Sequence, residues 1–158
     1  MTLAESFADQ IEKSITGPAW YGLSLLEAIN DINAKEALFR IDESSHNIWQ
    51  QVWHLNNWIE VVHNRLNGKE MPWLPAEEDW PSTEALKEQD WKNTRDTVFA
   101  SHKRFVEAAR KLSDSQLNQR VPGKDYSAAF MLQGIAQHVA YHTGQIVLVK
   151  KHLKRVAV

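Results

Sequence analysis

The stretch SSHNIWQQVWHLNNWIEVVHNRLNG occupies residues 44–68 and contains no proline and no glycine before its last residue. Its apolar residues recur at intervals of three or four: Ile48, Val52, Leu55, Ile59, Val62 and Leu66. This spacing places one apolar stripe along a helix and is typical of the seam of a helical bundle. Ser44 and Ser45 are the predicted N-cap residues, and Gly68 is predicted to end the helix.

Three further segments carry a helical pattern. Leu3, Phe7, Ile11 and Ile15 form one stripe, so the first helix is expected over residues 3–15. A third helix is expected from about residue 83 to 112, and a fourth from near Ser127 to about residue 154. Residues 23–39 are expected to form one or two short helices with a break at 31–33. No segment of the chain shows the pattern of a strand. We therefore expect an all-α, up-and-down four-helix bundle with a short helical insert, forming a single domain over residues 1–158.

Charge and composition limit the function. The chain has 18 basic and 20 acidic side chains, a net charge of −2, which argues against nucleic acid as its main partner. It has no cysteine, which excludes disulfides, thiolate metal sites and a cysteine nucleophile. It shows no signal peptide and no long uncharged apolar window, so we expect a cytoplasmic protein without a membrane partner.

Residues 68–82 form a long connection that contains Met71, Trp73, Trp80 and three prolines. Loops of this length in small domains are often functional lids or partner surfaces. The alternative is that the tryptophans simply anchor the loop to the bundle. The sequence leaves both interpretations open.

His138 and His142 are four residues apart, so on a helix they project from one face about one turn apart. This geometry lets both imidazoles bind one divalent ion. Both residues fall on the apolar stripe that holds Ile135 and Ile146, where a buried polar group needs a partner. A metal ion would satisfy both imidazoles at once.

A third ligand is expected from a neighbouring helix, and His54 is the best candidate because it lies beside Leu55 on the seam of residues 44–68. The alternative for His54 is a histidine at the edge of the core, hydrogen-bonded to a neighbour. His102 lies on the apolar stripe of the third helix and is the strongest competitor for a ligand role. Its other interpretation is a hydrogen-bonded core histidine.

A carboxylate-rich di-iron site does not fit the chain. Such sites need Glu-x-x-His on each of two helices, but Glu43 with His46 and Glu60 with His63 lie at or near one helix. The two pairs are 17 residues apart, or about 25 Å along a helix. Residues 127–158 contain no acid, so the predicted site is all-imidazole. His46 is interpreted as a residue before the helix and His63 as part of its solvated face.

Three separated motifs give the chain a resemblance to the DinB superfamily of small helical-bundle proteins, which includes the YfiT-like thiol transferases. They are GPAWYG at residues 17–22 with SLL at 24–26, HNIW at 46–49 leading to His54, and HVAYHTGQI at 138–146. The resemblance covers essentially the whole chain and keeps the motif order.

The resemblance implies a four-helix bundle, usually a homodimer, that holds a divalent metal with one histidine from the second long helix and two from the last. Carried over by motif, these are His54, His138 and His142, the three residues already selected. It further implies a metal-dependent hydrolase, or a transferase that joins a low-molecular-weight thiol to an electrophile. Imidazole ligands suit zinc, nickel and iron alike, so the identity of the metal is not predicted.

No carboxylate is obviously placed as a general base near these histidines. Asn57 and Gln145 are predicted to orient the ligands or a small-molecule substrate. The lack of a base favours thiol transfer over hydrolysis, and the thiol must come from a cosubstrate because the chain has no cysteine. The alternative function is a non-enzymatic stress- or damage-induced binding protein with a structural or vestigial metal site. A third possible function is nucleic-acid binding by the bundle through the basic residues 150–155.

Overall fold

The helix predicted around residues 48–66 is α4 (Ile48–Leu66). Asn47 caps it, because its side-chain oxygen accepts from the backbone N–H three residues on at 2.8 Å. The prediction that Ser44 or Ser45 is the cap is wrong. Both hydroxyls are instead hydrogen-bonded within a turn to Asp42.

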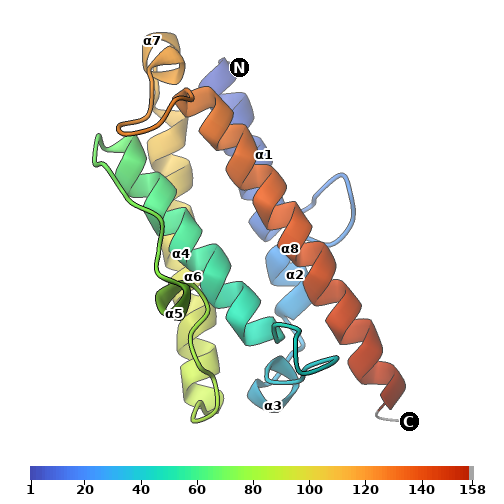
Figure 1. The fold of residues 1–158 in the computed structure, drawn as a ribbon. Helices are drawn as coiled ribbons and strands as arrows, with labels where there is room; N and C mark the ends of the chain where they lie inside the picture. Colours follow the sequence, from blue (N-terminus) through green and yellow to red (C-terminus); the bar gives the residue numbers. More distant parts are fainter. Residues whose placement is uncertain (157–158) are drawn as a thin grey trace.

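The computed structural model describes residues 1–156. Within that range the chain forms eight helices and no strand. They are α1 (Leu3–Thr16), α2 (Leu25–Ile29), α3 (Ala34–Ala37), α4 (Ile48–Leu66), α5 (Ala76–Asp79), α6 (Glu88–Arg110), α7 (Asp114–Asn118) and α8 (Ala128–Val156). The long helices pack as a ring, α4 on α6, α6 on α1, α1 on α8 and α8 on α4 (Figure 1). The predicted all-α four-helix bundle is thereby confirmed.

The helix directions do not alternate strictly around the bundle, because α1 and α8 run in one direction and α4 and α6 in the other (Figure 1). α4 and α6 run in the same direction (Figure 1), as shown by Trp49 packing on Trp91 near their starts and Glu60 pairing with Arg104 further along. Parallel neighbours need a connection that carries the chain back along the bundle. Residues 67–87 make this return and include the short helix α5. The long connection is therefore required by the topology, and it crosses the face of α4.

The short elements follow their capping residues. α2 begins at the capping box of Ser24, and α3 at that of Asn33. This confirms the prediction of one or two short helices with a break at residues 31–33, and shows that there are two. α7 begins at a capping box on Ser113, and Ser127 Oγ accepts from the backbone of Phe130 at the start of α8.

Two predicted details are wrong. The third long helix starts at Glu88 rather than near residue 83, because Thr83 is held outside it by a 2.8 Å hydrogen bond from Asn47 Nδ2. Leu3 is 54% exposed and does not belong to the buried stripe of α1. It occupies the first helical position, beyond the end of the core, and Ala4 is buried in its place.

Large aromatic side chains fill the centre of the bundle. Trp49 and Trp91 are fully buried, and each indole N–H has a partner, Thr94 Oγ1 at 2.9 Å and the Ile32 carbonyl at 2.7 Å respectively. Indoles whose N–H groups are hydrogen-bonded stabilise a core without leaving a buried donor unpaired.

Every helix within residues 1–156 is too short or too polar to cross a lipid bilayer.

Candidate metal centre

α4 and α8 bring His54, His138 and His142 together. The Nε2 atoms of His54 and His138 are 3.0 Å apart, and one ring nitrogen from each of the three residues lies within 4.8 Å of the others. His54 and His142 are buried and His138 is half-buried. Two helices thus deliver three imidazoles to one point, as the sequence predicts.

The second nitrogen of His54 has a strong partner. Its Nδ1 lies 2.7 Å from Oδ1 of Asp79, the last residue of α5. An ionised carboxylate only accepts hydrogen bonds, so Nδ1 carries the proton and Nε2 keeps a free lone pair. Carboxylates hold metal-binding histidines in this way.

His142 is held similarly but less firmly. Its Nδ1 lies 3.4 Å from Oε1 of Gln51, a long and therefore weak hydrogen bond. Donation from Nδ1 to the amide oxygen again leaves Nε2 as the free nitrogen. Two of the three imidazoles are therefore oriented by a neighbour that fixes which nitrogen faces the cluster.

Burial keeps the three imidazoles neutral at pH 7. Desolvation, together with the neighbouring imidazoles, lowers the pKa of His138 and His142 to about 4 and that of His54 to about 3. Burial also raises the pKa of Asp79 above its usual value. A neutral imidazole is the form that binds a metal ion.

The donor set fits a divalent metal ion. Two nitrogens each about 2.0–2.1 Å from one zinc ion lie about 2.9–3.4 Å from each other, depending on the bond angle. The 3.0 Å separation of the two Nε2 atoms of His54 and His138 falls in that range. Two neutral imidazole nitrogens at this distance need a proton or a cation between them, so the residues present fit the ion that the superfamily resemblance implies.

Trp80 closes one side of the cluster. Its ring stacks on His54 at 4.1 Å and on His46 at 3.7 Å, both nearly parallel at 11°. The segment that carries it is held to α4, because Trp53 and Asn57 both donate to the Glu78 carbonyl. The long connection is thus anchored by aromatic packing and also supplies groups that touch the cluster.

Two other histidines, His102 and His63, lie away from the cluster. His102 is buried on α6 beside Glu12 and Thr16 of α1, away from the cluster. Its Nδ1 has no hydrogen-bond partner among the described residues, so the expectation of a hydrogen-bonded core histidine is wrong for that atom. His63 is half-buried on α4 against Phe105.

Asn57 and Gln145 have indirect positions. Asn57 Nδ2 donates to the Glu78 carbonyl at 2.8 Å, so it holds α5 rather than an imidazole. Gln145 is half-buried on α8, three residues after His142. Their predicted role in orienting ligands or substrate stays a prediction.

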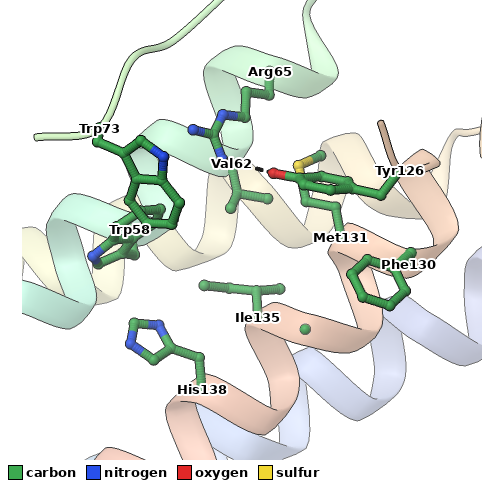
Figure 2. A pocket seen from close by; sticks show the side chains of 10 residues that line it. Trp58, Val62, Arg65, Trp73, Tyr126, Phe130, Met131, Ile135 and His138 are labelled. Atoms are coloured by element: carbon green, nitrogen blue, oxygen red, sulfur yellow. Dashed lines mark hydrogen bonds between the residues drawn. The ribbon is translucent and has the colours of Figure 1, made fainter. Parts of the chain in front are cut away.

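A cavity of about 310 Å³ opens beside the cluster. His138 stands at one end and Arg65 at the other, with Trp58 and Trp73 on one side between them (Figure 2). Its remaining walls are mainly apolar: Val62, Tyr126, Phe130, Met131, Gly134 and Ile135. A small molecule in this cavity would touch the histidine cluster through His138.

Sequence reasoning missed Asp79, the carboxylate that is hydrogen-bonded to His54. Asp79 and Trp80 lie in an irregular connection, where no periodicity indicates which side chains face the bundle. The signal that points to this segment is its length, because long loops in compact domains often carry functional residues.

Comparison with known proteins gives one match. A family model described as the DinB superfamily matches residues 24–146, more than three quarters of the chain, including all three clustered histidines. No curated protein and no solved structure matches the chain. The extent of the family match, the helical bundle and the histidine cluster together show that the chain belongs to the DinB superfamily.

Proposed function

We propose that the chain is a metal-dependent enzyme that joins a low-molecular-weight thiol to an electrophile, or catalyses a related hydrolysis, at His54, His138 and His142. The observation that carries the proposal is the convergence of three neutral imidazoles at the end of a cavity large enough for a small molecule. A divalent ion held by neutral ligands keeps its full charge and, as a Lewis acid, favours the deprotonated form of a thiol or of water.

The surrounding residues prepare the site for that ion. Asp79 holds the Nδ1 proton of His54, and Gln51 holds that of His142, so both Nε2 lone pairs remain available. Trp80 covers the ring of His54 and keeps water from that side. These contacts support a preorganised site rather than one assembled on binding.

Two features favour thiol transfer over hydrolysis. Among residues 1–156, Asp79 is the carboxylate hydrogen-bonded to the cluster, and that bond engages it with His54 rather than leaving it free as a base. The cavity walls are mainly apolar and suit an organic electrophile better than they suit water. Because the chain has no cysteine, the sulfur must come from a second small molecule.

The test combines metal content with thiol transfer. The purified chain, supplemented with zinc, nickel or iron, is expected to hold close to one ion per chain by elemental analysis. It is also expected to accelerate conjugation of cysteine or glutathione to a fluorogenic haloalkyl electrophile. His138→Ala should lose both properties, and His63→Ala, on the same helix as His54 but outside the cluster, should keep both.

Two outcomes would contradict the proposal. A chain that binds no metal after supplementation overturns the metal site itself. A chain that binds one ion but accelerates no transfer or hydrolysis beyond the His138→Ala variant overturns the enzymatic part and favours a non-enzymatic metal-binding protein.

A further inference from the structure

The cavity beside the histidine cluster contains a buried positive charge. Arg65, on α4, is only 4% exposed and lines the end of the cavity opposite His138 (Figure 2). Among the residues that the structure describes, no carboxylate lies within 4 Å of its guanidinium. Charged side chains are rarely buried this deeply without an opposite charge, because desolvation is costly.

The hydrogen bonds of Arg65 leave part of the guanidinium unsatisfied. One terminal nitrogen donates to the hydroxyl of Tyr126 at 3.2 Å and the other to the backbone carbonyl of Met71 at 3.0 Å. The buried Nε has no partner among residues 1–156. A guanidinium carries five N–H donors, and the two neutral acceptors satisfy neither all of them nor the charge.

The arrangement has a structural explanation, which accounts for it only in part. By bonding to Met71 and Tyr126, Arg65 ties the long connection and the start of α8 to α4. A neutral donor would serve that purpose without the cost of burying a charge. The charge itself is therefore available for a ligand.

The rest of the cavity complements an apolar molecule with one negative end. The guanidinium lies over the ring of Trp58 at 5.8 Å, so the cation contacts an aromatic wall of the cavity. Between Arg65 and His138 the surfaces are apolar, with Val62 and Ile135 among them. His54 and Arg65 are eleven positions apart on α4, which corresponds to about 16 Å of helix.

We propose that the cavity binds an apolar organic carboxylate whose negative group pairs with Arg65 and whose opposite end faces His138. The binding of the anion stands on the cavity alone. The statement that the end facing His138 is the reacting end rests on the proposed function. The substrate class is then an electrophile with a carboxylate at one end and its reactive carbon at the other, so Arg65 determines specificity through charge.

A pair of matched probes tests the charge preference. The full-length chain, treated with chelator so that no metal competes for the carboxylate, is titrated with 3-phenylpropanoate and with its neutral amide, and binding is followed by tryptophan fluorescence and calorimetry. The carboxylate is expected to bind about tenfold more tightly than the amide, the difference that one charge-assisted hydrogen bond supplies. Equal binding of the two probes would overturn the proposal.

A substitution tests whether Arg65 causes the preference for the carboxylate. Arg65→Met removes the charge but keeps apolar bulk, so the amide should bind as before and the preference for the carboxylate should disappear. Arg104→Met is the matched control, because Arg104 is an exposed arginine on α6 that pairs with Glu60 outside the cavity. A preference that survives Arg65→Met, or that Arg104→Met removes equally, contradicts the assignment.

A measurement on the unsubstituted chain covers the case in which Arg65→Met fails to fold. The Nε–H resonance of Arg65 in a nitrogen-15 spectrum should shift on addition of the carboxylate and stay in place on addition of the amide. An unmoved resonance at saturating carboxylate overturns the proposal.

Metal content measured on the same preparation before chelation separates the two proposals. One ion per chain without a carboxylate preference overturns this inference and leaves the proposed function standing. A carboxylate preference in a chain that binds no metal overturns the proposed function and retains the anion site.

Discussion

Two places in this bundle bury histidine, and they are built differently. At the α4–α8 face, His54, His138 and His142 converge, and two of them have their second nitrogen held by Asp79 or Gln51. Near α1, His102 is only 2% exposed, stands alone, and has an Nδ1 without a partner among the described residues. Burial lowers the pKa at both places, to about 4 for His102.

The comparison shows that burial and a lowered pKa do not by themselves mark a site. What distinguishes the cluster is mutual orientation, since its ring nitrogens face one another. His102 faces no other imidazole, and its burial makes the fold sensitive to acid. Each prediction below tests one side of this contrast.

The largest effect is expected from removing a ligand. His54→Ala, His138→Ala or His142→Ala should each lower metal affinity by more than the roughly 10- to 100-fold that loss of an outer hydrogen-bond partner costs. His102→Leu should leave metal affinity unchanged. Competition with a chromophoric chelator measures all four variants. Equal losses in His102→Leu and the cluster variants would remove the contrast.

The next effect is the part of the stability loss at low pH that comes from His102. Its pKa is 6.5 when unfolded and about 4 when folded, so between these values the unfolded chain binds more protons. Stability is therefore complete above pH 6.5 and falls as the pH drops to 4, by on the order of 3 kcal/mol from this residue.

Urea unfolding at pH 7 and pH 4.5 measures this loss. His102→Leu should unfold with a smaller difference between the two pH values than the natural chain. An identical pH dependence in the natural chain and His102→Leu would show that His102 contributes nothing to the loss of stability in acid.

A smaller effect is expected at the carboxylate that holds His54. Asp79→Asn should lower metal affinity by about 10- to 100-fold, because the amide no longer favours the Nδ1–H form of the ring. Glu78→Gln is the matched control on the same short helix, since its side chain is exposed and only its backbone carbonyl is used. If both variants bound metal equally well, Asp79 would have no part in the site.

Much of the site was predictable because it lies on regular helices. A helix fixes which side chains share a face, so the four-residue spacing of His138 and His142 and the position of His54 on its seam were sufficient to select them. Asp79 and Trp80 lie in the connection 67–87, which has no such period. Their approach to His54 depends on the path of that segment across α4.

The fold, like the site, has parts that the sequence predicts and parts that it does not. The helices and most of the capping residues of the short helices follow from local sequence patterns. The parallel direction of α4 and α6, in contrast, depends on tertiary packing between residues far apart in the sequence. The choice of Asn47 over Ser44 as the cap of α4 is also tertiary in part, because Thr83 accepts a hydrogen bond from the Asn47 side chain. The sequence likewise did not predict that the charge of Arg65 lies in the cavity, since arginine is common near the end of a helix.

The smallest effect is expected at Gln51. Gln51→Leu should weaken metal binding by less than about tenfold, because the 3.4 Å contact to His142 is weak and its acceptor is neutral. Measured beside Asp79→Asn, it ranks the two orienting contacts. A larger loss for Gln51→Leu than for Asp79→Asn would reverse that ranking and the reason given for it.

The central claim is that three histidines from two helices hold one metal ion. Crystals grown with zinc, nickel or iron and measured on both sides of the metal's absorption edge test it directly. The expected result is one anomalous peak between the Nε2 atoms of His54 and His138 and the ring of His142, absent from crystals of His138→Ala. No peak at that position, or a peak only at other residues such as His102, would contradict the claim.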